Sequence, residues 1–367
     1  MQLHKTCLLA AQNLSKVNQT PRGMKAFMSI LCSRGTKWWS PLMADKVQLR
    51  KHHLPRIFQR MRSSQLQATP QTQTPAYREQ PKCRFIQYRR PNEHSKRLGM
   101  VSEDGSKMVE LSNVTCASPS MLDFIRQRYC MKSLLHSVQY MKARDVDAVC
   151  PELLPPLEAP GKIVGVDCNY KDNCDEQNIP IPREPAFYVK FATSITGALD
   201  IIAPHSPGKR IDYGCQLAVV MGKRCRQVSP KEALSNIFGY MVVQDIVARD
   251  WNSLLGGRSM DNFLPLGPVI VHRCHVPDVN NLWMRTLVNG EERQFGHTSN
   301  MIFKVDTLIH RLSHYMTLCP GDIILTGTPA GSAAYSDTTS FLQPGDMIET
   351  EIQNLGKMYN KIIEAYK

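Results

Sequence analysis

The amino-acid sequence predicts an α+β fold that is mainly β, with a small N-terminal β module followed by a larger C-terminal domain. Two observations support this prediction. Short segments in which apolar and polar residues alternate recur through residues 83–367, and Pro and Gly separate them, as is typical of half-buried strands joined by turns. Apolar residues at helical spacing occur in only a few stretches of the same region, so few helices are expected.

Residues 1–82 differ in composition from the rest of the chain. They contain fourteen Lys and Arg and only two acidic residues, a net charge of +12 out of the +13 of the whole chain. Residues 65–80 form a low-complexity stretch rich in Gln, and residues 1–82 lack a sustained apolar periodicity. Because such a composition buries too little apolar surface to fold alone, we expect a basic arm that is disordered in isolation.

The sequence leaves three roles open for this arm. Basic residues alternate with apolar ones and the first acidic residue is Asp45, which is typical of a mitochondrial transit peptide. An untargeted basic tail is the alternative, and it would leave the protein cytoplasmic. The third role is recruitment of nucleic acid or an acidic membrane by the basic cluster 50–62 and by Trp38 and Trp39. A run of charge is weak evidence for such binding, so a nucleic-acid partner is not expected.

The remaining residues predict a series of elements and no transmembrane helix. Within residues 83–150, strands are expected at 84–88, 99–101 and 108–111, with a turn at 103–105 and a helix within 121–140. Prolines mark residues 151–161 as a linker. The larger domain is expected over residues 162–367, with helices near 230–236 and 307–316. The chain has no run of about 18 apolar residues that would cross a membrane.

The twelve cysteines are scattered at wide spacings. The sequence contains no C-x-x-C pair and no Cys/His group with the spacing of a zinc site. We therefore expect free thiols in a reducing compartment. Cys168, Cys174 and Cys215 lie beside the motifs described next, and small apolar side chains that fill the core are the expected role for them.

Several separated motifs of residues 83–367 resemble, in order, those of the fumarylacetoacetate hydrolase family, and most closely its domain-containing protein 2 group. The motifs are Asn169 and Tyr170 with Glu176, KFA (190–192), AVVMGK (218–223), QDIVARDW (244–251), DNFLPLGP (261–268), VNGE (288–291) and PGDIILTGTP (320–329). The resemblance implies a mixed β-roll and a homodimer. It also implies a metal-dependent hydrolase or an oxaloacetate keto–enol tautomerase that acts on small 2-oxo or β-dicarbonyl acids.

The resemblance implies a divalent ion, Mg²⁺ or Mn²⁺, held by two glutamates of an E-x-E strand and one aspartate. Here these positions hold Gly214, Gln216 and Asp245. Alternation along a strand sends residues 214 and 216 to the same face, but only Asp245 carries charge. Because Mg²⁺ prefers anionic oxygen ligands, we predict a degenerate metal site. An Asp245 carboxylate satisfied by neighbouring backbone or by Arg249 is the alternative.

The acid–base and cationic positions of the family are also changed. The family pairs a histidine with a glutamate three residues later, and here these positions hold Asn173 and Glu176. Asparagine cannot carry a proton near neutral pH, and a solvated loop is the alternative for Glu176. Arg258 stands where the family usually has lysine, which keeps the charge in a planar form. These three residues are the candidate catalytic residues.

The candidate substrate-binding residues are Arg249, Asn252, Thr328 and Lys190. A guanidinium suits a substrate carboxylate, and the turn that contains Thr328 offers N–H groups and hydroxyls to an anionic oxygen. A plain turn is the alternative for that segment. Lys190 is either an active-site cation or, as we expect, a strand lysine paired with Asp200 or Glu184.

Three functions follow from these observations. The first is a family hydrolase or tautomerase with a degenerate metal site and weak or no activity. The second is a non-catalytic homologue that binds a small acid or pairs with an active subunit. The third is a protein whose basic arm recruits nucleic acid or membrane. The combined loss of charge at residues 173, 214 and 216 favours a site without the family chemistry.

Overall fold

The computed structural model describes residues 83–111, 120–149, 151–202, 210–251, 257–335 and 340–364. In these residues, sheets dominate and helices are few and short, which confirms the predicted fold class. The predictions made for residues 1–82 lie outside the described residues. No helix in the described part of the chain is both long and apolar enough to cross a membrane.

The three strands expected within residues 83–111 are present and form an antiparallel meander. They are β1 (Arg84–Arg89), β2 (Lys96–Val101) and β3 (Lys107–Glu110), and Gly105 adopts a positive φ of 67° in the turn between β2 and β3. The edge of β1 opposite β2 is divided. Its first two residues pair with β15 (Ile270–His272), and its last three pair with β5 (Glu152–Leu154), a short strand within the proline-rich segment.

The stretch predicted as one helix forms two helices. They are α4 (Met121–Arg126), capped by the Ser120 side chain, and α5 (Met131–Val138). Arg128 lies between them with a φ of 55°, a left-handed conformation that no α-helix continues through. Both helices bury apolar side chains, including Phe124 and Leu134, in one core with Phe85 of β1. The helical periodicity was therefore correct for burial, but it missed the break.

Eleven strands of the described residues form the larger sheet. Its order is β4-β3-β2-β1-β15-β12-β11-β18-β6-β7, with β5 beside β1. The bounds not yet given are β4 (Arg144–Asp145), β6 (Ile163–Asp167), β7 (Ala186–Lys190), β11 (Cys215–Met221), β12 (Ile237–Gln244) and β18 (Ile323–Leu325). All seven residues of β11 are buried. Leu217 and Val219 join one hydrophobic core while Ala218 and Val220 join another, as expected for a central strand covered on both faces.

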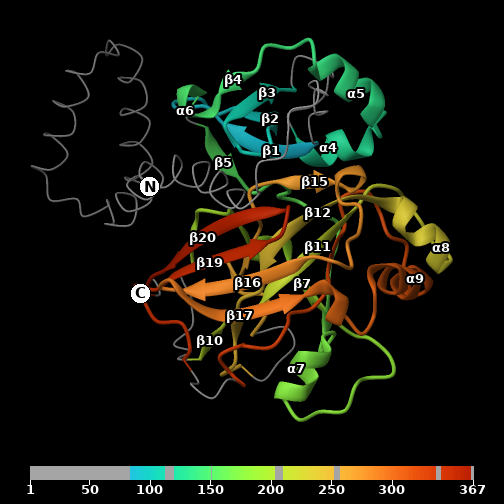
Figure 1. Ribbon diagram of the computed structural model, residues 1–367, viewed down its shortest axis with the longest axis vertical. Coiled ribbons are helices and arrows are strands. Elements are labelled where there is room, and N and C mark those ends of the chain that lie inside the picture. The colour runs from blue at the N-terminus through green and yellow to red at the C-terminus, as the bar shows by residue number, and fades with distance from the viewer. Residues whose placement is uncertain are drawn as a thin grey trace, which may run out of the picture. The chain divides into compact units, whose positions relative to one another are not determined.

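A five-stranded sheet packs against the larger one. Its order is β17 (Glu291–His297), β16 (Trp283–Val288), β19 (Met347–Ile352), β20 (Gly356–Ile362) and β9 (Ile201–Ile202). Strands β11 and β12 contact β16, β19 and β20 (Figure 1). Two further pairs are β10 (Ile211–Asp212) with β13 (Val247–Ala248) and β8 (Ile195–Thr196) with β14 (Leu264–Pro265).

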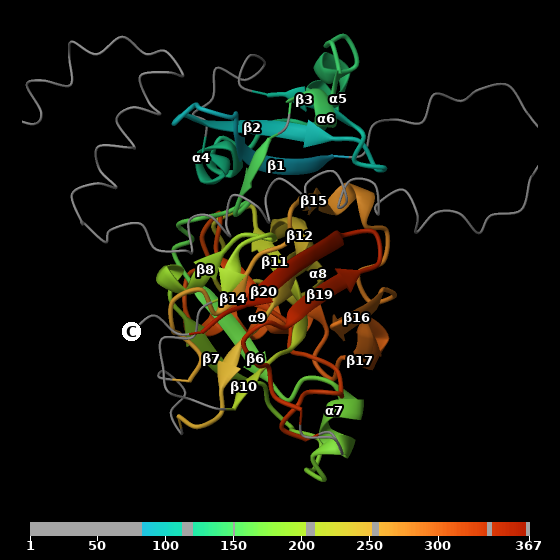
Figure 2. The same ribbon diagram turned by 90° about the vertical axis from the view of Figure 1, so that its left-hand side faces the viewer.

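The remaining helices are short. They are α6 (Val146–Val149), α7 (Lys171–Glu176), α8 (Pro230–Ala233) and α9 (Val305–Tyr315), and the 3₁₀ turns are η2 (Ala192–Ser194), η3 (Leu234–Asn236), η4 (Arg273–His275) and η5 (Thr298–Asn300). The helices predicted near 230–236 and 307–316 are thus present. In both views, α7 and β10 lie at the same end of the sheets (Figures 1 and 2). Residues of α7, and residues that follow β10, line the candidate site.

Candidate functional site

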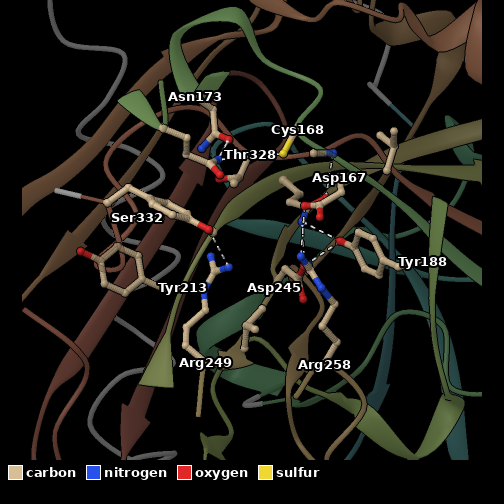
Figure 3. A pocket seen from close by; sticks show the side chains of 17 residues that line it. Asp167, Cys168, Asn173, Tyr188, Tyr213, Asp245, Arg249, Arg258, Thr328 and Ser332 are labelled. Carbon is tan, nitrogen blue, oxygen red and sulfur yellow. Dashed lines mark hydrogen bonds and ion pairs between the residues drawn. The ribbon is translucent and has the colours of Figure 1, made fainter. Parts of the chain in front are cut away.

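A small pocket collects most of the candidate residues. Its volume is about 60 Å³, room for roughly four to six water-sized spheres. We call it the Asp245 pocket. Seven of the candidate catalytic, substrate-binding and metal positions line it (Figure 3), namely Asn173, Gly214, Gln216, Asp245, Arg249, Arg258 and Thr328, and Cys168 lines it as well. Lys190 and Glu176 lie behind the lining, and Asn252 lies outside the described residues.

The Asp245 carboxylate is buried and surrounded by hydrogen-bond donors. Its Oδ2 accepts from the Tyr188 hydroxyl at 2.7 Å, from Gln216 Nε2 at 2.9 Å and from Arg258 Nη1 at 3.2 Å. Its Oδ1 lies 2.6 Å from Lys190 Nζ. Burial by itself would raise the pKa of Asp245, but Lys190 and Arg258 outweigh it and hold that pKa below its ordinary value. Asp245 is therefore ionised, and other side chains satisfy it.

Lys190 is the innermost cation of the site. Its side chain is fully buried, and Nζ donates to the carbonyl oxygens of Ile246 at 3.0 Å and Phe263 at 2.9 Å besides pairing with Asp245. Burial lowers the pKa of Lys190, and Asp245 opposes that shift. The expected pairing with Asp200 or Glu184 was wrong. Strand β7 turns Lys190 into the core, whereas Asp200 accepts from Gly197 N and Glu184 pairs with Arg311.

Arg258 bridges two carboxylates. Its Nη1 lies 3.2 Å from Asp245 and its Nη2 lies 3.1 Å from Asp167, while its guanidinium carbon lies 4.1 Å from the centre of the Tyr188 ring. Burial by itself would lower the pKa of Arg258, but Tyr188, Asp245 and Asp167 outweigh burial and hold that pKa above its ordinary value. The guanidinium is therefore charged, and a planar group of this kind is suited to holding two carboxylates at once.

The two positions expected to hold glutamates lie in the pocket wall. Gln216 uses its amide fully, because Nε2 donates to Tyr188 Oη and Asp245 Oδ2 while Oε1 accepts from Gly327 N at 2.8 Å. Gly214, which has no positive φ, follows β10, and a Cβ placed on it would lie 3.0 to 3.1 Å from Thr328 side-chain atoms. The strand geometry thus presents both positions to the cavity, but only one of them has a side chain there.

The positions of the family dyad lie on α7. Asn173 is buried; its Nδ2 donates to Pro329 O at 3.4 Å, and its Oδ1 accepts from Gln177 Nε2. Both carboxylate oxygens of Glu176 accept from Gly331 N, at 3.0 and 3.1 Å. Glu176 is therefore fixed at the end of a helix, and the solvated loop considered for it was wrong. Its carboxylate faces the backbone of residue 331, whose φ is +94°.

Arg249, which follows β13, and Thr328, which follows β18, both line the pocket. Arg249 Nε donates to the buried Asp212 at 2.9 Å, and its guanidinium carbon lies 5.2 Å from the Tyr335 ring centre. In Figure 3 the guanidinium groups of Arg249 and Arg258 both point into the space between the labelled residues. Thr328 Oγ1 accepts from Gln294 Nε2 at 3.0 Å, which leaves its hydroxyl hydrogen for another acceptor.

Sequence reasoning missed Tyr188, Asp167 and Gln294. Tyr188 precedes Lys190 by two residues on β7, so strand alternation is a signal that was available for it. Its ring fills the space over Gly165, where any Cβ would lie 2.1 Å from the ring. Burial and Asp245 raise its pKa far above the ordinary value, so the phenol donates. Asp167 and Gln294 carried no comparable signal, because their partners are distant in sequence.

Comparison with known proteins identifies the class to which this fold and site belong. Residues 162–363 match the fumarylacetoacetate hydrolase C-terminal family. The chain is 35% identical over 287 residues to oxaloacetate tautomerase FAHD2A, mitochondrial, of Bos taurus, which covers 76% of this chain and 91% of the relative. The human protein of the same name is 34% identical over 287 residues, which again cover 76% of this chain and 91% of the relative.

Solved structures agree. A fumarylacetoacetate hydrolase from Exiguobacterium antarcticum matches with a TM-score of 0.69 and 30% identity, over 77% of this chain and 99% of its own. Maleylpyruvate hydrolase from Sphingobium sp. SYK-6, in complex with manganese(II) ion and pyruvate, matches with a TM-score of 0.66 and 26% identity, over 77% and 100% of the two chains. The chain described here belongs to the fumarylacetoacetate hydrolase family.

The residues present do not fit the divalent ion that the family implies. Mg²⁺ and Mn²⁺ prefer several oxygen ligands, mostly anionic. In the Asp245 pocket, Tyr188, Gln216 and Arg258 donate to Oδ2 of Asp245, while Oδ1 is ion-paired with Lys190 but accepts no hydrogen bond. The Gln216 carbonyl oxygen is committed to a backbone N–H, and Gly214 offers no ligand atom. An ion would have to compete with Lys190 for Oδ1 of Asp245 and with Arg258 for Oδ2.

Proposed function

We propose that this chain binds a small 2-oxo acid in the Asp245 pocket without a divalent ion, and that its hydrolase or tautomerase activity is weak or absent. One observation supports this proposal above the others. The Asp245 carboxylate, in the position of a metal ligand, is buried and already paired with Lys190 and Arg258. Two side-chain cations thus neutralise the charge that a metal would otherwise neutralise.

The charge balance of the pocket supports the same proposal. Lys190, Arg249 and Arg258 face the carboxylates of Asp167, Asp212 and Asp245. Among the described residues at the pocket, these three cations are therefore balanced by these three carboxylates. A divalent ion would bring two uncompensated positive charges into a largely buried site, and unpaired charge is costly there. An acid also brings uncompensated charge, but Arg258 can compensate it if the part-exposed Asp167 turns toward water.

Arg258 is the residue best placed to receive the acid. Its partner Asp167 has a side chain that is 44% exposed, whereas Asp245 is 2% exposed. Asp167 can therefore turn toward water and leave Nη2 of Arg258 to a ligand carboxylate, while Nη1 stays anchored on Asp245. Arg249, held by Asp212 through Nε, and the Thr328 hydroxyl are in position to hold the other end of the acid.

Weak turnover is expected because the pocket lacks a proton carrier that works near neutral pH. Hydrolysis and keto–enol exchange both move protons, and an effective acid or base has a pKa near the working pH. No histidine is among the described residues that line the pocket. Burial raises the pKa of the Cys168 thiol to about 11, and Asn173 does not titrate. The bound acid would therefore be oriented but not efficiently converted.

Calorimetric titration of the full chain with oxaloacetate and with pyruvate tests this proposal, in excess chelator and again with excess Mg²⁺ or Mn²⁺. We expect the same affinity under both conditions and a rate of oxaloacetate tautomerisation equal to the uncatalysed rate. A rate that rises with added metal and saturates would contradict the proposal, as would binding that requires the metal.

Arg258→Gln and Arg311→Gln form a matched pair for this test. Arg258→Gln removes a charge-assisted hydrogen bond worth about 1.5–3 kcal/mol, so we expect acid binding weaker by roughly 10- to 100-fold. Arg311 pairs with Glu184 at the surface, with a side chain 44% exposed, so Arg311→Gln should bind like the parent. Equal binding by both variants would show that the acid does not use Arg258.

We also propose that the chain is mitochondrial and that it forms a homodimer or pairs with an active family member. Relatives named as mitochondrial and the charge pattern of residues 1–82 support the location. The family resemblance alone supports the dimer. Imaging a fluorescent fusion of residues 1–82 tests the first point, since diffuse cytosolic signal would oppose it. Light scattering after size exclusion tests the second, since a monomer at micromolar concentration would oppose it.

A further inference from the structure

Two cysteines and a histidine meet at the junction between β1 and β15, away from the Asp245 pocket. Cys83 precedes β1, while Cys274 and His275 lie in η4 directly after β15. The thiol sulfurs and an imidazole nitrogen all lie within 4.8 Å of one another. We call these three residues the Cys–His cluster. It is the one group of such ligands found among the described residues.

Antiparallel pairing of β1 with β15 creates this cluster. Arg84 pairs with Val271, and His272 N donates to Cys83 O at 2.9 Å. The chain then turns into η4, which carries Cys274 back toward Cys83. The sequence separates Cys83 from Cys274 by 191 positions, so no linear spacing rule for zinc sites detects the cluster.

We propose that the Cys–His cluster binds a zinc ion, with Cys83, Cys274 and His275 as ligands. With Zn–S bonds of about 2.3 Å, ligand atoms of a tetrahedral site lie about 3.8 Å apart. The separations in the cluster are at most 4.8 Å, so small side-chain rotations bring all three atoms to bonding distance. A water molecule would complete the tetrahedron from the solvent side, where Cys274 is exposed.

The ligand types select zinc over the hard ions of the family. Thiolate and imidazole are soft or borderline donors that bind Zn²⁺ well, whereas Mg²⁺ and Ca²⁺ take oxygen ligands. No carboxylate belongs to the cluster. The same chemistry also suits Cu(I), so the metal preference is an outcome that the test has to measure.

His272 positions both sulfur ligands without being one of the three. Its backbone N–H holds the Cys83 carbonyl, while its Nδ1 accepts from Cys274 N at 3.3 Å and lies 2.9 Å from Cys274 Sγ. Its ring also packs edge-on against Phe238, with centroids 5.4 Å apart. Partners of this kind fix the geometry of metal ligands. The ion would therefore cross-link the start of β1 to the end of β15.

Metal titration of the reduced full chain tests the proposal. The probes are Zn²⁺ in competition with a coloured chelator, and Co²⁺, whose thiolate complexes absorb strongly in the near ultraviolet. We expect one tightly bound Zn²⁺ per chain and a Co²⁺ spectrum with thiolate charge-transfer absorption. Cys274→Ser should weaken Zn²⁺ binding by at least roughly 100-fold, and His272→Ala by roughly 10- to 100-fold.

Cys130→Ser is the matched control, because Cys130 is also an exposed cysteine but lies outside the cluster. It should leave Zn²⁺ binding unchanged. Cys83 is fully buried, so Cys274→Ser, at an exposed position, is the variant expected to fold normally, and circular dichroism checks that. Absence of Zn²⁺ uptake by the reduced chain would overturn the proposal. So would uptake that survives Cys274→Ser, tighter binding of Cu(I) alone, or a Co²⁺ complex without thiolate absorption.

Discussion

The Asp245 pocket and the Cys–His cluster differ in the kinds of group that surround their ligand atoms. In the pocket, the one carboxylate of the family site is buried and bonded to Lys190, Arg258 and two neutral donors. In the cluster, three soft ligand atoms gather and one of their residues is exposed. Membership of a metal-dependent family therefore does not locate the metal, because ligand atoms already committed to internal cations are not available to an ion.

Neighbouring groups lower the pKa of one acidic group in each site, but by different means. Burial raises the pKa of Asp245, and the charges of Lys190 and Arg258 lower it further than burial raises it. In the cluster, a hydrogen bond from Cys83 and the neighbouring His272 lower the pKa of Cys274 against the opposing effect of burial. Hydrogen-bond donors yield to a metal more readily than buried cations, since displacing a buried cation leaves its charge unpaired.

The largest expected effect is a gain of metal binding in the pocket. The triple variant Gly214→Glu, Gln216→Glu, Asn173→His supplies two carboxylates around Asp245 and a proton carrier beside Glu176. A charge pair at 4 Å is worth about 4 kcal/mol at an effective dielectric near 20. We therefore expect the dissociation constant for Mg²⁺ to fall from millimolar or higher to micromolar, and the variant to turn over oxaloacetate at a measurable rate. Calorimetry and an enol absorbance assay measure both.

Two additions sharpen this experiment. Gly214 does not need a positive φ, but its Cβ would crowd Thr328, so adding Thr328→Ser removes a methyl and keeps the hydroxyl. Arg258→Lys returns the residue usual in the family and frees space between Asp167 and Asp245. Equal activity of the parent and all variants at saturating metal would place the chemistry on other residues and refute the pairing described for Asp245.

The second effect concerns stability. Lys190→Met leaves Asp245 buried without its nearest cation, and breaking a buried pair in this way costs about 3–5 kcal/mol. Urea unfolding measures the change. Lys107→Met is the control, since Lys107 and Asp145 form an exposed pair worth at most about 1 kcal/mol. The double variant Lys190→Met, Asp245→Asn should lose less than the sum of the single variants; a strictly additive loss would show that the two groups do not interact.

The third effect comes from the Cys–His cluster. If zinc binds only the folded chain, a free concentration 100 times its dissociation constant stabilises the fold by about 2.7 kcal/mol. Chelation should therefore lower the melting temperature of the parent and of Arg258→Gln alike, but not that of Cys274→Ser. If chelation leaves the melting temperature of the parent unchanged, zinc does not stabilise the fold, and the proposed cross-link between β1 and β15 is contradicted.

The smallest effect is expected from the arm. Deleting residues 1–82 removes a net charge of +12 and a segment without sustained apolar periodicity, so the melting temperature of the remainder should stay nearly unchanged. Calorimetry at fixed zinc concentration is the measurement. A clear fall would mean that the arm packs against the fold, and it would contradict the disorder predicted from its composition.

The sequence by itself determined the family, the fold class and seven of the positions that line the pocket. Motif order gave the family, and alternation along the strand was enough to place residues 214 and 216 on one face. It also showed the missing charge at Gly214, Gln216 and Asn173. These features are local or depend on motif position, so a single sequence is enough to predict them. The helix break at Arg128 was missed because a left-handed φ on arginine leaves no signal in apolar periodicity.

Tertiary structure alone decided what satisfies Asp245 and where soft ligands gather. Lys190 reaches Asp245 because β7 turns it into the core, and Arg258 reaches Asp167 across 91 positions. Cys83 meets Cys274 only through the pairing of β1 with β15. Ion pairs and metal sites depend on distances of a few ångströms between atoms far apart in the chain. Packing of sheets sets those distances, and no periodicity along the sequence encodes them.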